Sequence, residues 1–134
     1  MFRLAILVSA LILGGNIGLL SAQAQETESE TEQERIEKGV REMGLLAGYA
    51  YQCHLRTGDE DAAETVGDES LAVAEIVLED VGSTLAFLFA GNAGFGAGTT
   101  FESENCEQAI VEWNKFVDEF FADEEDESEE ASSS

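Results

Sequence analysis

Apolar residues recur at three- and four-residue steps through most of this chain, which is the spacing of one face of an α-helix. The first such segment spans residues 31–57 and places five apolar residues on one face: Ile36, Val40, Met43, Ala47 and Ala50. Thr31 and Glu34 fit a capping box at its start. Gly58 suits the left-handed residue that often follows a helix. The pattern therefore predicts a long first helix.

A second helix is predicted over residues 61–81, with Asp61 and Glu64 forming its N-terminal cap. Its apolar face contains Val66, Val73, Val77 and Val81. Gly67 interrupts this face, and glycine inside a helix costs about 1 kcal/mol. The pattern leaves two alternatives, one continuous helix or a short helical turn followed by a main segment from residue 68.

The last predicted helix begins with Ser103 as its cap. Its apolar stripe contains Cys106, Ala109, Ile110, Trp113, Phe116, Val117 and Phe120. Residues 123–130 are nearly all acidic, and carboxylates oppose the helix dipole at a C-terminus. We therefore expect this helix to end near Phe121 and residues 123–134 to form a disordered acidic tail.

Residues 85–98 are rich in glycine, yet small residues recur there at every fourth position: Ala86, Ala90, Gly94 and Gly98. Phe87, Gly91 and Phe95 form the neighbouring series. The first helix carries its own small residues at Gly44 and Gly48. Small residues let two helix backbones approach closely. We predict that the two small stripes face each other, with the phenylalanines filling the core beside them.

No charged residue lies between Val81 and Phe101, a length sufficient to span a bilayer. The many glycines make the segment only weakly apolar, and its acidic flanks provide no basic anchor. We interpret it as a core helix and expect no stable membrane span, with a membrane helix as the alternative.

The chain contains no proline, and it shows no alternating strand pattern and no internal repeat. The predicted fold is all-α, a small bundle of about four helices. Its two cysteines predict a disulfide, Cys53–Cys106, which would contribute about 4 kcal/mol by closing a long loop. Free thiols or intermolecular pairing are the alternatives. The bond would join the end of the first helix, residues 44–53, to the beginning of the last.

The N-terminal residues have the layout of a secretory signal peptide, in which Arg3 precedes an apolar stretch and Ala22-Gln23-Ala24 matches a cleavage site. This predicts a signal peptide over 1–24, a disordered acidic leader over 25–34 and a helical domain over 35–122. An uncleaved anchor is the alternative. We expect an exported protein in the periplasm or the external medium, where disulfides persist.

The formal net charge is −23. Such a surface repels nucleic-acid phosphates and anionic lipids, so neither is an expected partner. Basic proteins or cations are favoured electrostatically, although high charge also serves solubility alone. Of the acidic residues, Asp59, Asp61 and Glu64 are weak candidates for binding calcium. An EF-hand loop beginning at Asp59 would need glycine at position 64 and glutamate at position 70, and it has neither.

Catalytic residue sets are poorly represented in this sequence. His54 is the single histidine, and its neighbour Cys53 is expected to be oxidised. One histidine and two paired cysteines are too few ligands for zinc. We therefore predict no enzyme activity and no cofactor.

Three aromatic residues, Tyr49, Tyr51 and Trp113, are candidates for a binding surface, because aromatic side chains often anchor interfaces. At helical spacing they also fit a core. The predicted function is binding of another protein, as an accessory, inhibitor or immunity factor. The alternatives are an acid-responsive periplasmic chaperone, whose carboxylates would lose their charge below about pH 4, and a low-affinity binder of divalent cations.

Overall fold

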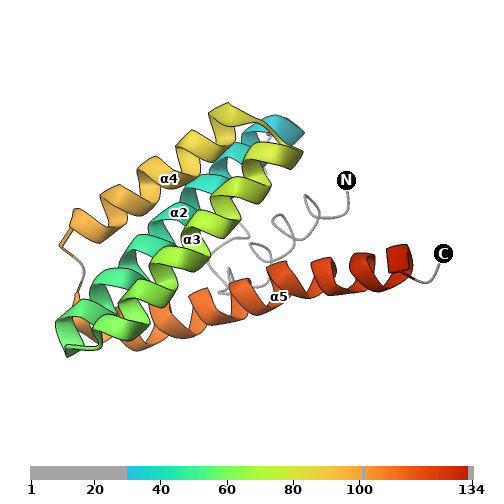
Figure 1. The fold of residues 1–134 in the computed structure, drawn as a ribbon. Coiled ribbons are helices and arrows are strands. Elements are labelled where there is room, and N and C mark those ends of the chain that lie inside the picture. Colours follow the sequence, from blue (N-terminus) through green and yellow to red (C-terminus); the bar gives the residue numbers. More distant parts are fainter. Residues whose placement is uncertain (1–29, 101, 133–134) are drawn as a thin grey trace, which may run out of the picture.

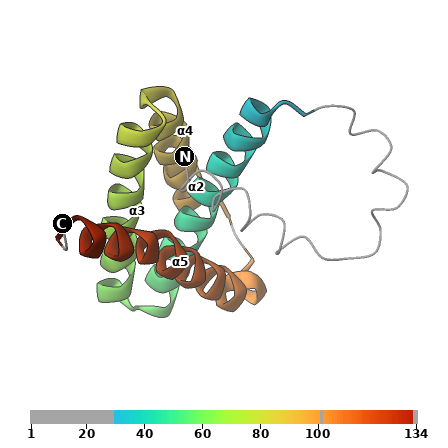
Figure 2. The same ribbon diagram turned by 90° about the vertical axis from the view of Figure 1, so that its right-hand side faces the viewer.

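The computed structural model describes residues 30–100 and 102–132, so the predicted signal peptide and the first half of the predicted leader, residues 25–29, lie outside the described residues. These described residues form four helices, α2 (Glu32–Thr57), α3 (Glu60–Asp80), α4 (Ser83–Gly98) and α5 (Cys106–Ser132), with a short 3-10 turn at Ser103–Asn105. Helices α2, α3 and α4 lie side by side, and α5 runs across them (Figures 1 and 2). The predicted all-α bundle is confirmed.

Helix α2 begins and ends at the residues that its capping pattern predicts. The hydroxyl of Thr31 accepts a hydrogen bond from the backbone N–H of Glu34, and the Glu34 carboxylate accepts one from the N–H of Thr31. Gly58 adopts φ 77° and ends the helix in the left-handed conformation. The whole predicted apolar face is buried, from Ile36 to Ala50. This helix forms the centre of the bundle.

Helix α3 is continuous through Gly67, so the alternative of a short helical turn followed by a separate segment from residue 68 is wrong. Val66 and Val73 are buried on either side of Gly67. Burying such side chains stabilises by roughly 1.5–3 kcal/mol each, which exceeds the cost of the glycine. The predicted cap was misplaced by two residues. The carboxylate of Asp59, not that of Asp61, accepts a hydrogen bond from the N–H of Ala62.

A turn at Gly82, with φ 119°, reverses the chain between α3 and α4. An L side chain rarely adopts this angle, which explains glycine at this position. Helix α4 then covers Ser83–Gly98, so residues 85–98 are helical as predicted.

Helix α5 differs from the prediction at both ends. Ser103 begins the 3-10 turn instead of capping α5. At the other end, the helix continues past Phe121 to Ser132. Glutamate has a high intrinsic helix propensity, and this outweighs the unfavourable dipole on which the predicted end was based. The helix end predicted near Phe121 is therefore wrong, whereas the predicted disorder of residues 123–134 stays a prediction.

The core lies between α2, α3, α4 and the first half of α5. Its largest fully buried side chains are Trp113 and Phe89. Phe116 packs against both Trp113 and Phe120, with ring centroids 5.5 and 5.3 Å apart. The predicted disulfide Cys53–Cys106 is present, with a Cα–Cα distance of 5.4 Å, and joins the end of α2 to the start of α5. The α5 stripe that covers the core is thus fixed at one end by a covalent bond.

Candidate binding face on helix α4

Helix α4 packs against α2 through direct backbone contact. A Cβ atom added at Gly48 would lie 2.5 Å from the backbone nitrogen of Ala97 and would collide with the carbonyl of Ala93. A Cβ atom added at Gly96 would lie 2.6 Å from the carbonyl oxygen of Leu45. Gly44 likewise lies against Phe89. Glycine is therefore required at these three positions for the two helices to approach so closely.

The α4 side of this contact differs from the predicted stripe. Gly44 and Gly48 lie against α4, but the residues opposite them are Phe89, Ala93 and Gly96. In the predicted series Ala86 is half-buried, whereas three members are exposed: Ala90, Gly94 and Gly98. Because α4 is apolar on all sides, its small residues alone do not identify the inward face. Burial of the larger side chains Leu85 and Phe89 determines the orientation instead.

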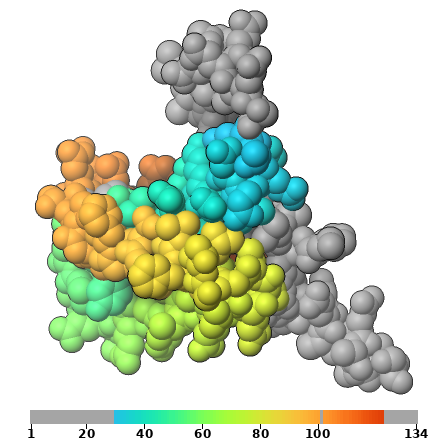
Figure 3. Space-filling model, turned by 90° about the horizontal axis from the view of Figure 1, so that it is seen from above, coloured from blue at the N-terminus to red at the C-terminus, as the bar shows by residue number. Residues whose placement is uncertain are grey.

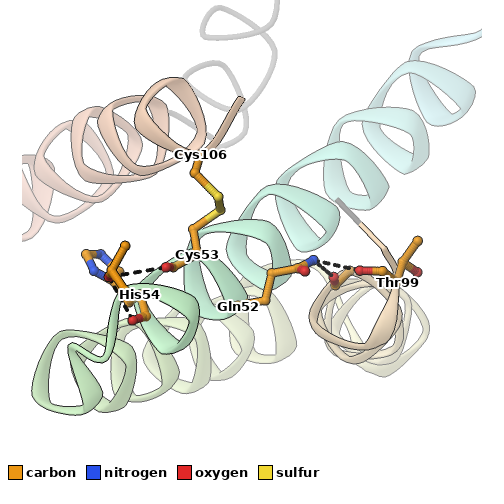
Figure 4. The surroundings of a disulfide bond; sticks show 7 residues. Gln52, Cys53, His54, Thr99 and Cys106 are labelled. Atoms are coloured by element: carbon orange, nitrogen blue, oxygen red, sulfur yellow. Dashed lines mark hydrogen bonds between the residues drawn. A yellow bond between two sulfur atoms is a disulfide. The ribbon is translucent and has the colours of Figure 1, made fainter. Parts of the chain in front are cut away.

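Gln52 adds a polar connection at the end of the same contact. Its side-chain amide donates hydrogen bonds to the backbone oxygens of Gly96 at 2.6 Å and Thr99 at 2.9 Å. Figure 4 shows the side chain reaching from α2 to the end of α4. The last carbonyls of a helix lack partners within the helix, so Gln52 caps α4 from outside. The apolar pattern of α2 did not reveal this role.

The opposite side of α4 carries exposed apolar residues. Phe87 is 81% exposed and Phe95 is 64% exposed, so the prediction that they fill the core is wrong. Together with four exposed small residues they make up what we call the outer face of α4: Phe87, Ala90, Gly91, Gly94, Phe95 and Gly98. No other helix of the described residues covers this face, which Figure 3 shows open between α2 and α3. Exposed aromatic residues of this kind are typical of interaction sites.

The outer face is flat between its two aromatic residues. A Cβ atom added at Gly91, Gly94 or Gly98 would meet no atom within 4 Å among the described residues. Phe87 and Phe95 are eight positions apart, which corresponds to about 12 Å along the helix. The face therefore offers two aromatic anchors with a shallow glycine surface between them.

The aromatic residues predicted as a binding surface are not exposed. Trp113 is 0% exposed, and its indole N–H donates a hydrogen bond of 2.7 Å to the carboxylate of Glu69 on α3. Trp113 is therefore a core residue, because its large ring completes the packing between α5 and α3. Tyr49 and Tyr51 are both half-buried, and Tyr51 packs against the core beside Gly67.

His54 lies near the disulfide but does not form a catalytic pair with a cysteine. Cys53 is bonded to Cys106, and Figure 4 shows the His54 ring directed away from that bond. The backbone oxygens of Cys53 and His54 accept hydrogen bonds from the hydroxyl of Thr57. This end of α2 is organised around its C-terminal cap.

The candidate calcium ligands take part in local helix structure. Asp59 caps α3, the backbone oxygen of Asp61 accepts a bond from the Thr65 hydroxyl, and the side chain of Glu64 is exposed. No cluster of three or more metal-ligating side chains occurs among the described residues. Within the same part of the chain, no helix is both long and apolar enough to cross a membrane.

In the part of the chain that the structure describes, the fold is a disulfide-linked bundle of four helices, and one of them presents an uncharged aromatic face to solvent. Comparison of the chain with protein-family models, with curated proteins and with solved structures gives no match.

Proposed function

We propose that this chain is an exported, non-enzymatic protein that acts by binding another protein through the outer face of α4. The observation that carries the proposal is the exposure of Phe87 and Phe95 on a helix without any charged residue. Burying a phenylalanine side chain would stabilise by roughly 1.5–3 kcal/mol. Folding of the chain does not bury these two side chains, so burying them against a bound protein would stabilise the complex.

The remaining features agree with a binding role. Aromatic side chains are enriched among the residues that dominate interface energies. The rest of α4 is fixed by tight packing on α2 and by the Gln52 cap, so the face is held on a rigid element. Little conformational freedom would be lost on binding.

Export rests on the signal-peptide pattern of residues 1–24, and a disulfide is compatible with it. The acid-responsive chaperone and the cation binder stay predictions from the sequence.

Site-specific photo-crosslinking in the producing cell tests this proposal. A photoreactive phenylalanine analogue is placed at position 87 and, as a matched control, at Val111, which is 60% exposed on α5. We expect a discrete adduct with one other protein from position 87 and none from position 111. Absence of an adduct at 87, or the same adducts from both positions, would overturn the proposal.

A further inference from the structure

Resting on the proposed function, we propose that the partner presents an amphipathic helix with lysine or arginine residues along the side of its apolar stripe that faces α3. Two features point to such a helix, the shape of the outer face of α4 and the charge of helix α3 beside it. The two are independent properties of the surface, and each restricts the partner in a different way.

The shape favours a helix over a bulky or extended partner. Gly91 and Gly94 have open space where a side chain would be, so an incoming helix can approach the α4 backbone closely. Phe87 and Phe95 lie at the two ends of this surface, and both are available to pack against apolar residues of that helix. Recognition of an amphipathic helix by an apolar surface with a few anchors is a recurring mode.

The charge favours a basic partner. Helix α3 lies alongside α4 (Figure 3), and its exposed charged side chains are all acidic: Glu60, Asp61, Glu64, Asp68, Glu75, Glu79 and Asp80. No lysine or arginine occurs between Arg56 and Lys115, a segment that includes the whole of α3 and α4. Helix α2, on the other side of α4, exposes Arg35, Lys38 and Arg41, so the charge beside the outer face is purely acidic only on the α3 side. This difference would orient a bound helix with its basic residues toward α3. A second copy of this chain is disfavoured, because each copy carries a formal charge of −23.

Three fluorescein-labelled helical peptides provide the test. They share one leucine–alanine stripe and differ only in the residues along one side of it, which are lysine, glutamine or glutamate. Binding to the exported chain is measured by fluorescence polarisation. We expect the lysine peptide to bind at least about tenfold more tightly than the glutamine peptide, and the glutamate peptide to bind most weakly. Raising the ionic strength from about 0.1 M to about 1 M shortens the Debye length from about 10 to about 3 Å, so the lysine advantage should largely disappear.

The double substitution Phe87→Ser with Phe95→Ser locates the binding site, and Val111→Ser is the matched control. Both aromatic residues are exposed, so the double variant should keep the helical circular-dichroism spectrum of the native chain. We expect it to bind the lysine and glutamine peptides at least about tenfold more weakly, while V111S binds like the native chain.

Three results would overturn the inference. If lysine and glutamine peptides bind equally well and both depend on the phenylalanines, the face binds helices without charge selection, and the proposed function stands. If the lysine peptide binds the double variant as well as the native chain, or no peptide binds, the outer face is not a helix-binding site of this kind. Crosslinking at position 87 then decides the proposed function separately.

Discussion

The two sides of α4 contain the same kinds of residue and use them differently. On the inner side Phe89 is 1% exposed and Gly96 touches the backbone of α2, whereas on the outer side Phe87 is 81% exposed and Gly94 faces open space. The inner residues are explained by packing within the chain. The outer residues are not, because the fold requires neither an aromatic ring nor a glycine there. Residue type alone therefore does not show which side of this helix supports the fold.

The largest expected contrast is between two phenylalanines only two positions apart. Phe89→Ala should lower the free energy of unfolding by about 4 kcal/mol, because it leaves a cavity in the core. Phe87→Ala should change it by less than about 0.5 kcal/mol. Urea denaturation of both variants measures the two changes in the free energy of unfolding. Equal losses would show that both sides of α4 are buried within the folded protein, contrary to this comparison.

Glycine substitutions separate the two sides in the same way. Gly48→Ala should destabilise by about 3 kcal/mol, since the added Cβ meets backbone atoms of α4 that have no free space to move into. Gly94→Ala is the matched control, and the same denaturation experiment applies. A Gly48→Ala variant as stable as the native chain would mean that α2 and α4 do not touch at this point.

Loss of the Gln52 hydrogen bonds should have a smaller effect. Gln52→Met keeps nearly the same volume but removes the donor to Gly96 and Thr99. We expect a loss of about 2 kcal/mol, the cost of leaving a buried carbonyl unpaired. Gln33→Ala on the exposed part of α2 is the control and should be almost neutral. If Q52M proves equally neutral, water or another group already pairs these carbonyls.

The smallest effect has the opposite sign. Gly91→Ala and Gly94→Ala should each stabilise the isolated chain by up to about 1 kcal/mol, because alanine is the better helix former and its methyl group meets no neighbour. Thermal denaturation would show a raised Tm. A lowered Tm would indicate that the outer face is already packed, for example against a second copy of the chain.

The helices themselves were largely predictable from local sequence. The Thr31–Glu34 capping box and Gly58 located both ends of α2, and the spacing of Trp113, Phe116 and Phe120 identified the buried side of α5. The disulfide followed from there being two cysteines in a chain expected to be exported. The helix ends and buried sides depend on residues within one or two helical turns. The disulfide was predictable because two cysteines can form only one intramolecular bond.

The orientation of α4 was not predictable in the same way. An amphipathic helix reveals its buried side through its polar side, but α4 has no charged residue and its small and aromatic series run side by side. To decide which side of α4 is buried, one must know which phenylalanine ring fits between the neighbouring helices. For the same reason the candidate surface was placed at Trp113, which is buried, while Phe87 and Phe95 were assigned to the core.

One variant, Gly94→Gln, tests directly whether the outer face of α4 is the binding site when its stability and its binding of the lysine peptide are both measured. Glutamine is uncharged, favours helix, and finds open space at this position. Its side chain would nevertheless obstruct a helix approaching the outer face. We expect a free energy of unfolding equal to or above that of the native chain, together with peptide affinity reduced at least about tenfold. Unchanged affinity in the stable variant would contradict the claim that the outer face of α4 is the binding site.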